Sequence, residues 1–214
     1  LFLDDVIIET MTGARRKLHE PVRREKVILP EHPWEAHLAI HAQQFPDGDG
    51  YRMVYGCAAG DPDGGNPRVT AMAESDDGFT WTKPIVDVIE FDGSTKNNLV
   101  WKGPGKNVAA FLDENPDATW DARYKAIARG DRGSDGEDTL LAMSSPDGIH
   151  WRLMFDGPIF GDGPFDTHNI AFWDTWRKEY VLYARSAHGV GSFKGGVRWI
   201  RRSTSSDFED WTPW

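Results

Sequence analysis

The stretch that decides the fold is Ser75-Asp76-Asp77-Gly78-Phe79-Thr80-Trp81, because it recurs along the chain. A second copy reads Ser145-Pro146-Asp147-Gly148-Ile149-His150-Trp151, and a third, without the glycine, reads Ser205-Ser206-Asp207-Phe208-Glu209-Asp210-Trp211. The tryptophans are 70 and then 60 residues apart. Asp can cap its own backbone and Gly accepts a positive φ, so each copy predicts a tight turn followed by a Trp that packs between sheets.

Short β-rich runs, bounded by Gly, Asp, Asn and Pro, precede each copy of the turn. They span residues 37–40, 51–55 and 69–73, then 108–111, 124–128 and 139–143, and finally 169–172, 180–184 and 197–201. Each Trp can begin a fourth strand, and no segment has a helical period over 11 or more residues. Four antiparallel strands repeated in this way are typical of a β-propeller blade, so the predicted fold is all-β, with about three blade units.

The blade units divide a single domain. We expect a leader at 1–31, blade units at 32–96 and 97–163, and a third, incomplete unit at 164–214. Closed propellers usually have at least four blades, so three units leave an open sheet edge. Either further chain or another subunit would close the ring, and a homo-oligomer is the expected partner state.

Composition narrows the classes of function. The 214 residues carry 24 Lys and Arg against 34 Asp and Glu, and a net charge of -10 argues against a nucleic-acid partner. No apolar run approaches the 18 residues of a membrane span, and Leu1-Phe2-Leu3-Asp4-Asp5 shows no signal peptide. A single cysteine, Cys57, excludes an intrachain disulfide and a Cys-rich metal site. The cellular compartment stays open.

A carboxylate-x-His pattern heads the innermost strand in two of the units. It reads Glu35-Ala36-His37 in the first unit and Asp166-Thr167-His168 in the third. Residues two apart point to the same face of a strand, so each unit can send a carboxylate and an imidazole into the central channel. Two facing carboxylates are the apparatus of glycoside hydrolysis, and Glu35 and Asp166 are therefore the predicted catalytic pair. The alternative is that both acids only cap turns.

Several other side chains are candidates for binding a carbohydrate substrate. Trp34 directly precedes Glu35 and can stack on a sugar ring, and Arg185, in register with Arg129, can clamp a hydroxyl or a carboxylate. The predicted substrate-binding residues are Trp34, His37, Asn98, Asn107, His168, Asn169 and Arg185. Trp173, Trp176 and Trp199 are expected to pack instead, and Asp113 and Asp174 to serve turns. Neither a metal nor a cofactor is predicted.

Together these residues resemble a known family. The motifs that carry the resemblance are Leu1-Phe2-Leu3-Asp4-Asp5, His32-Pro33-Trp34-Glu35, Phe111-Leu112-Asp113-Glu114-Asn115-Pro116 with Arg123-Tyr124-Lys125-Ala126, Asp166-Thr167-His168-Asn169, and Arg201-Arg202-Ser203 with Asp207-Phe208 and Trp211. They look like the five-bladed propeller glycosidases, the invertase, levansucrase and arabinanase superfamily, and more narrowly its bacterial glycosyl hydrolase members.

The resemblance implies five blades and an active site in the funnel, with acids on the inner strands of the first three blades. Relatives commonly carry an Asp base in blade one, an assisting Asp in blade two and a Glu acid in blade three. Here Glu35 stands in the first unit and Asp166 in the third, while the second offers no acid in register.

Three functions remain open at this point. The first is a glycoside hydrolase. The second is a glycoside phosphorylase, because related five-bladed propellers use one acid and bind phosphate with Arg and His, and phosphate dependence would separate the two. The third is a non-catalytic carbohydrate-binding or assembly propeller.

Overall fold

The computed structural model describes residue 6 and residues 8–38, 41–58, 68–132, 137–188 and 197–214. Within these ranges the regular structure is almost entirely β, and the helical elements are two short 3₁₀ turns, η1 (Pro33–Glu35) and η2 (Trp120–Ala122). No helix in the described ranges has the length and the apolar character needed to cross a membrane.

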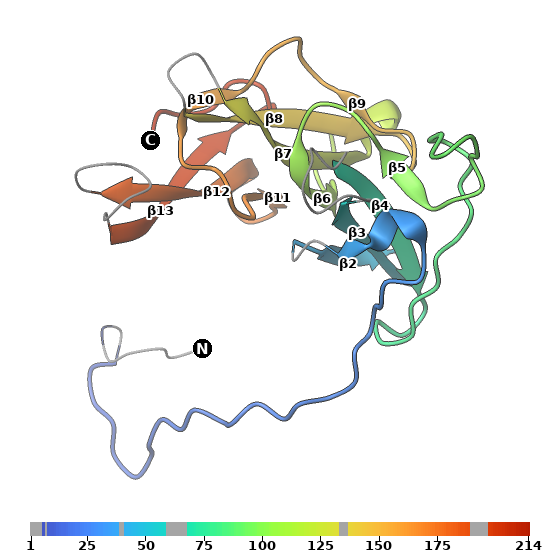
Figure 1. Cartoon of the computed structure of the whole chain (residues 1–214). Helices are drawn as coiled ribbons and strands as arrows, with labels where there is room; N and C mark the ends of the chain where they lie inside the picture. Colours follow the sequence, from blue (N-terminus) through green and yellow to red (C-terminus); the bar gives the residue numbers. More distant parts are fainter. Residues whose placement is uncertain (1–5, 7, 39–40, 59–67, 133–136, 189–196) are drawn as a thin grey trace.

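Three antiparallel sheets follow one another along the chain (Figure 1). The first contains β1 (His37–Leu38), β2 (Gln43–Asp47), β3 (Gly50–Ala58), β4 (Arg68–Ser75) and β5 (Leu99–Trp101). Both β1 and β2 pair with β3, so they form one inner strand with an interruption between them. Since β5 pairs with β4, the first sheet extends to residue 101, beyond the boundary expected at 96.

The second and third sheets repeat this order of inner, middle and outer strands. The second contains β6 (Lys106–Leu112), β7 (Tyr124–Arg132), β8 (Asp138–Ser145), β9 (Arg152–Leu153) and β10 (Phe160–Gly163). The third contains β11 (Ile170–Asp174), β12 (Glu179–His188) and β13 (Val197–Ser205). The inner strands β2, β6 and β11 lie side by side in the middle of the molecule (Figure 1). The all-β blade arrangement predicted from the repeats is therefore confirmed.

The recurring turns form as the sequence predicts. The Oγ of Ser75 accepts the N–H of Gly78 at 2.8 Å, and Oδ1 of Asp77 accepts the N–H groups of Phe79 and Thr80. The second copy makes the same bonds from Ser145 and Asp147.

The third copy of the turn keeps the same backbone shape without its glycine. Gly78 and Gly148 have φ of 75° and 73°, and Phe208 takes their place with φ of 70°. A side chain in this left-handed region is strained. Phe208 is fully buried, packing edge-on against Tyr180, so burial of its ring offsets the strain.

Apolar clusters join neighbouring sheets. Val54, Val108 and Ala126 belong to the cluster between the first and second sheets, which also contains Trp151. A second cluster joins the second and third sheets through, among others, Phe111, Ile127, Leu140, Leu182 and Phe208. A third lies on the other face of the first sheet and is covered by Ile28, Trp34, Trp81, Ile89 and Phe91. These contacts bury the face that each unit could not bury alone.

A polar clamp also links neighbouring units, and it occurs twice. The hydroxyl of Tyr124 donates to Asp47 at 2.7 Å, and Arg52 pairs with the same carboxylate at 2.8 Å. One unit later, the hydroxyl of Tyr180 donates to Asp113 at 2.7 Å, and Lys125 pairs with it. Asp113, which was expected to serve a turn, therefore also ties one unit to the next.

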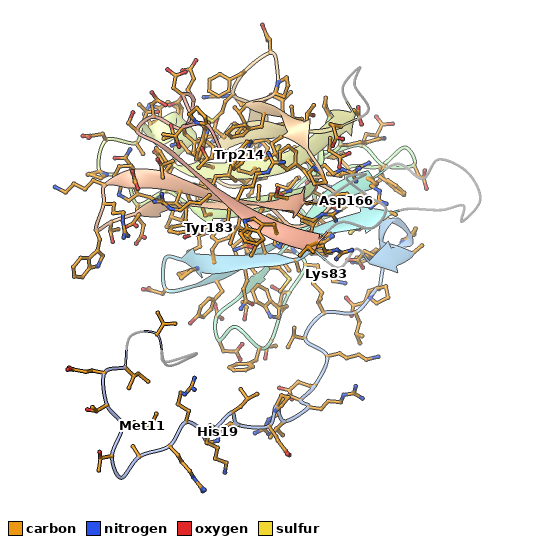
Figure 2. All side chains as sticks on the ribbon, turned by 90° about the vertical axis from the view of Figure 1, so that its left-hand side faces the viewer. Met11, His19, Lys83, Asp166, Tyr183 and Trp214 are labelled. Carbon is orange, nitrogen blue, oxygen red and sulfur yellow. The ribbon has the colours of Figure 1, made fainter. Side chains whose placement is uncertain are left out.

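The leader runs as an extended chain away from the sheets. Most of residues 8–27 are exposed, and Met11 and His19 lie far from the sheets in Figure 2. Contact with the body resumes at Ile28, which packs against the first sheet.

Candidate functional site

The heads of the inner strands meet at one end of the sheets, which we call the near mouth. The imidazole rings of His41, just before β2, and His168, just before β11, have centroids 5.6 Å apart. Asn107 holds the corresponding place in β6. Each of these three residues stands six positions before an aspartate that ends its inner strand or directly follows it.

Strand register supports this equivalence. Gln43 pairs with Val54 in the first sheet, and Ile170 pairs with Tyr183 in the third. Val54 comes three residues after Tyr51, the second residue of β3. Tyr183 comes three residues after Tyr180, the second residue of β12, so the two pairs are equivalent. His41 stands two residues before Gln43, and His168 stands two residues before Ile170.

The register expected for the first unit is therefore corrected. Glu35 and His37 stand four residues too early to match Asp166 and His168, because the inner strand of the first unit is interrupted between β1 and β2. The residue that takes the place of His168 is His41. The side chain of His37 lies outside the described part of the structure.

Asp166 lies at the near mouth in an ion pair with Arg185 of β12. The side chain of Asp166 is 31% exposed and that of Arg185 is 13% exposed, so the carboxylate stays accessible while its partner is largely buried. The charge of Asp166 also acts on His41, raising the pKa of that imidazole. The structure thus brings together Asp166, Arg185 and His168 from the prediction and adds His41.

The surroundings of the two histidines favour the neutral imidazole. Burial lowers the pKa of His41, the positive charge of Arg68 lowers it further, and Asp166 opposes both. Burial and the neighbouring His41 lower the pKa of His168. A neutral imidazole has one N–H donor and one acceptor nitrogen, which suits hydrogen bonding to sugar hydroxyls.

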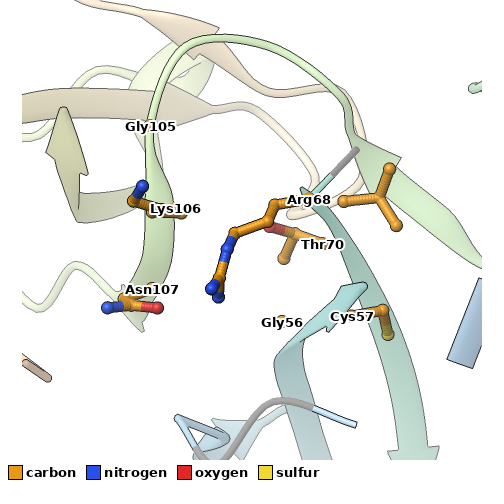
Figure 3. A pocket seen from close by; sticks show the side chains of 8 residues that line it. Gly56, Cys57, Arg68, Thr70, Gly105, Lys106 and Asn107 are labelled. Atoms are coloured by element: carbon orange, nitrogen blue, oxygen red, sulfur yellow. The ribbon is translucent and has the colours of Figure 1, made fainter. Parts of the chain in front are cut away.

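Positive charge accumulates next to these histidines. Arg68, Lys106 and Asn107 line a small cavity of about 10 Å³, which has room for about one water molecule. Figure 3 shows Arg68 reaching from β4 toward Asn107 and Lys106 on β6. Burial lowers the pKa of Lys106, and the charges of Arg129 and Arg68 lower it further.

Only part of this positive charge is balanced. Arg129 pairs with the fully buried Asp138 at 2.7 Å. Arg68 and Lys106 have no ion pair with any residue of the described ranges. The near mouth can therefore receive an anion or an electron-rich oxygen.

An open pocket of about 450 Å³ adjoins Asp166 through Arg185 and His168. Tyr183 and Trp199 form part of its wall. Trp199 was expected to pack; its side chain is 57% exposed and lines this pocket from β13. Aromatic walls next to hydrogen-bonding groups are typical of sites for amphipathic ligands such as sugars.

Glu35 occupies a different environment. Its side chain is fully buried, with Oε1 accepting the hydroxyl of Tyr55 at 2.6 Å and Oε2 accepting Lys83 at 2.9 Å. The backbone N–H groups of Glu31 and His32 donate to Oε2 as well. Burial alone would raise the pKa of Glu35, but the hydrogen bonds from Tyr55, the backbone and Lys83 hold it below its usual value. Such a saturated carboxylate is suited to anchoring the chain, and it shares no contact with Asp166 within the described residues.

Trp34 and Asn98 belong to the environment of Glu35. The indole N–H of Trp34 donates to Oδ1 of Asn98 at 2.9 Å, and its ring stacks on His32. Asn98 is buried and donates to the hydroxyl of Tyr55 and to the carbonyl of Met72. Neither side chain reaches the cluster around Asp166 in the described structure.

Asn169 is a buried connector beneath the near mouth. Its amide donates to the carbonyl oxygens of Phe165 and Thr167, while its side-chain oxygen accepts the N–H of Arg185. Both ends of the amide are thereby used. Asn169 thus ties the head of β11 to the strand that carries Arg185.

The sequence held a signal for His41 that strand patterning missed. Counting six positions back from Asp47, Asp113 and Asp174 gives His41, Asn107 and His168. Those aspartates are sequence markers because each stands at the end of an inner strand or just after it.

Among the described residues, no cluster of three or more His, Cys, Asp or Glu side chains is arranged to hold a metal ion.

Comparison with known proteins identifies the fold. No family model matches the chain, and no curated protein matches it in sequence. Solved structures do match. A fructofuranosidase from Schwanniomyces occidentalis complexed with fructosylnystose matches with a TM-score of 0.60 and 14% identity, covering 86% of this chain and 34% of that one. The chain has the fold of the propeller glycosidases.

Two other matches extend the comparison. A structure from the GH130 family, described as mannoside phosphorylases that include hydrolases targeting β-1,2 mannosidic linkages in Candida mannan, matches with a TM-score of 0.54 and 16% identity, covering 85% of this chain and 50% of that one. A structure of BT0996 in complex with RGII matches with a TM-score of 0.54 and 15% identity, covering 88% and 59%. The chain thus spans between about a third and three fifths of these three proteins.

Proposed function

We propose that the chain belongs to a glycoside hydrolase, with Asp166 at the near mouth as its catalytic carboxylate. The observation that carries this proposal is the accessible carboxylate of Asp166, paired with Arg185 and flanked by His41 and His168 beside an aromatic-walled pocket. The solved structures with the same fold are largely glycoside hydrolases, which supports this class of substrate.

The ion pair suggests the role of Asp166 in the reaction. The ionised carboxylate can accept the proton of a water molecule that attacks the anomeric carbon. The bond from that carbon to the leaving oxygen then breaks, the leaving oxygen takes up a proton from a solvent water molecule, and Asp166 returns its own proton to the solvent. His41 and His168, as neutral imidazoles, can each donate one N–H hydrogen bond to a sugar oxygen.

The test is the Asp166→Asn variant, which keeps the shape of the side chain and removes its charge. The substrate panel follows the ligands of the matching structures: a fructan, a β-1,2-linked mannan and RGII. We expect turnover by the wild type on one of these and at least a 100-fold loss of kcat in the variant, the scale of proton-transfer catalysis. Asp156→Asn, which removes an exposed carboxylate on the connection from β9 to β10, is the matched control and should retain kcat. Equal rates for Asp166→Asn and wild type would exclude Asp166.

A second candidate is a glycoside phosphorylase. The specific observation that favours it is the pair of cations Arg68 and Lys106 at a small cavity, with Arg68 also acting on His41, although Asp131 and Asp138 offset part of the charge around Lys106. Phosphate would then replace water as the attacking group. Glycosidic cleavage that requires inorganic phosphate and yields a sugar phosphate would establish this function, whereas cleavage in phosphate-free buffer would establish the hydrolase. Saturable binding to the panel without any turnover would instead indicate a carbohydrate-binding propeller.

A second copy of the chain is the partner that we propose for the third sheet. This sheet exposes apolar side chains that line the pocket beside Asp166, including Ile170 at 38% and Ile200 at 69%. Self-association would cover these side chains, and the second subunit would then form one side of the pocket beside Asp166. Light scattering at micromolar concentration tests this: a mass near twice 24.1 kDa is expected, and a monodisperse mass of 24.1 kDa would contradict it.

A further inference from the structure

The opposite end of the inner strands, which we call the far mouth, carries two nearly fully exposed tryptophans. Trp120 is 81% exposed and Trp176 is 93% exposed. Trp120 lies on the connection from β6 to β7, and Trp176 lies on the corresponding connection from β11 to β12. Neither has a ring contact, a cation–π contact or a hydrogen bond from its indole N–H within the described residues. The expectation that Trp176 packs in the interior is therefore wrong.

The two connections are neighbours in space. The side-chain amide of Asn115, on the first connection, donates to the hydroxyl of Tyr180, at the end of the second, at 3.0 Å. Between the ends of the three inner strands lies a pocket of about 260 Å³. Its lining includes Pro46 from β2, Leu112 from β6 and Phe172 from β11.

The backbone beneath each exposed ring is fixed. Oδ1 of Asp174 accepts the backbone N–H of Trp176 at 3.0 Å. Beside Trp120, Asp121 accepts the hydroxyl of Thr119 at 2.6 Å and pairs with Arg152 at 2.7 Å. A flat ring presented on an ordered turn loses little entropy when it binds a ligand.

We propose that the far mouth is a second carbohydrate-binding surface, distinct from the near mouth, on which Trp120 and Trp176 stack against sugar rings of a polysaccharide. The kind of substrate rests on the proposed function; the surface itself rests on these two rings. Stacking on an indole uses the apolar face of a sugar, while the hydroxyls around its edge need hydrogen-bonding groups.

The setting of the rings favours a sugar over a protein as the occupant. The same two connections are rich in charged residues, among them Glu114, Asp117, Asp121 and Arg177, all of them exposed or on exposed turns. A stable protein interface needs a contiguous apolar core, with charged residues at its rim. Two exposed rings on turns rich in charged residues instead suit a sugar chain, whose units each have one apolar face and several hydroxyls.

The experiment measures binding separately from turnover. Asp166→Asn serves as the background, so that a polysaccharide is bound without being cleaved. Native gels containing the fructan, the mannan or RGII report retardation of the protein. We expect retardation by one of the three, with the apparent Kd raised about five- to tenfold by Trp120→Ala or by Trp176→Ala, and more by both together. Trp120→Phe and Trp176→Phe keep a ring and should retain most of the binding.

Leu18→Ala is the matched control, because Leu18 is 96% exposed and lies on the leader. It should leave retardation unchanged, and all variants should share the Tm of the background. In the Asp166-containing protein, the tryptophan variants should cleave a short oligosaccharide at the wild-type rate and lose rate only on the polysaccharide. This result also separates the two proposals: retardation without turnover would leave the far-mouth surface standing while the glycosidase function fails.

Three results would overturn the inference. The first is retardation equal in the background and in the double tryptophan variant. The second is the absence of retardation by all three polysaccharides. The third is a change from dimer to monomer in the double variant without any loss of polysaccharide binding, which would show the far mouth to be a protein interface.

Discussion

The imidazoles of His41 and His168 lie 5.6 Å apart although they come from the first and the third blade units. Their meeting point is where three inner strands begin, and it is the place where Asp166 and Arg185 form their ion pair. The cluster forms only when the units fold together. A measurement on its side chains therefore tests the assembled structure and not a single strand.

The two histidines should titrate below the ordinary histidine value of 6.5. Burial disfavours the charged imidazolium in the folded state, so stability that depends on the neutral rings is present above pH 6.5 and is lost as the pH falls below it. Histidine NMR titration measures both values. Arg68→Gln should raise the pKa of His41, and Asp166→Asn should lower it. Unchanged titration in both variants would contradict the arrangement at the near mouth.

Replacing Glu35 by Gln should destabilise the fold by about 3 kcal/mol, because a buried ion pair with Lys83 is broken and a cation is left behind. Glu31→Gln is the matched control, since Glu31 contacts the same Lys83 at 3.0 Å but is 62% exposed. It should cost less than about 1 kcal/mol. Chemical denaturation gives both free energies of unfolding, and equal losses would contradict the buried role of Glu35.

The pH dependence of stability supplies a second test of Glu35. Its folded pKa lies below the ordinary value of 4.5. The carboxylate therefore contributes stability that is fully present above about pH 4.5 and is lost as the pH falls through the folded value. Wild type should lose part of its free energy of unfolding on acidification, and Glu35→Gln should lose less over the same interval. Parallel curves for the two proteins would count against the assignment.

The clamp between the second and third units should be cooperative. Tyr180→Phe removes one hydrogen bond to Asp113 and should cost about 1–2 kcal/mol. Lys125→Met leaves the buried Asp113 without its cation and should cost about 3–5 kcal/mol. A double-mutant cycle between the two positions should give a coupling free energy of at least about 0.5 kcal/mol. Strict additivity would show that the two partners act independently.

Gly148 should tolerate substitution less well than Gly93, although both have a positive φ, of 73° and 78°. A Cβ on Gly148 would meet the guanidinium of Arg52, whereas a Cβ on Gly93 meets no atom within 4 Å. Gly93→Ala should therefore cost about 1 kcal/mol from backbone strain alone, and Gly148→Ala should cost more. Thermal unfolding of the two variants compares them, and an equal Tm would mean that Arg52 yields without cost.

The repeats were sufficient to predict the fold. Asp77 and Asp147 cap turns whose geometry depends on neighbouring residues alone, and strand patterning around them is likewise local. The site was harder to predict. An interruption between β1 and β2 shifts the register so that His41, and not His37, occupies the near mouth. Register depends on pairing with a distant strand, which a local pattern does not report.

The burial of Glu35 could not be predicted for a similar reason. Its partners Tyr55 and Lys83 are 20 and 48 residues away along the chain. A carboxylate near a strand head looks the same in sequence whether it faces solvent or a buried cation. Arg185, in contrast, could be placed because its position in the middle strand matches that of Arg129 in the preceding unit.

The cover over the first sheet has a consequence for the order of folding. Its outer apolar face is covered by Trp34, Trp81, Ile89 and Phe91, which come from within or just before the first unit. This unit can cover that outer face with its own residues as soon as it leaves the ribosome, while its other face and the later units depend on contacts between units. Vectorial synthesis would thus present each later unit with an already formed surface on which to fold, which lowers the time that unpaired strand edges spend open to aggregation.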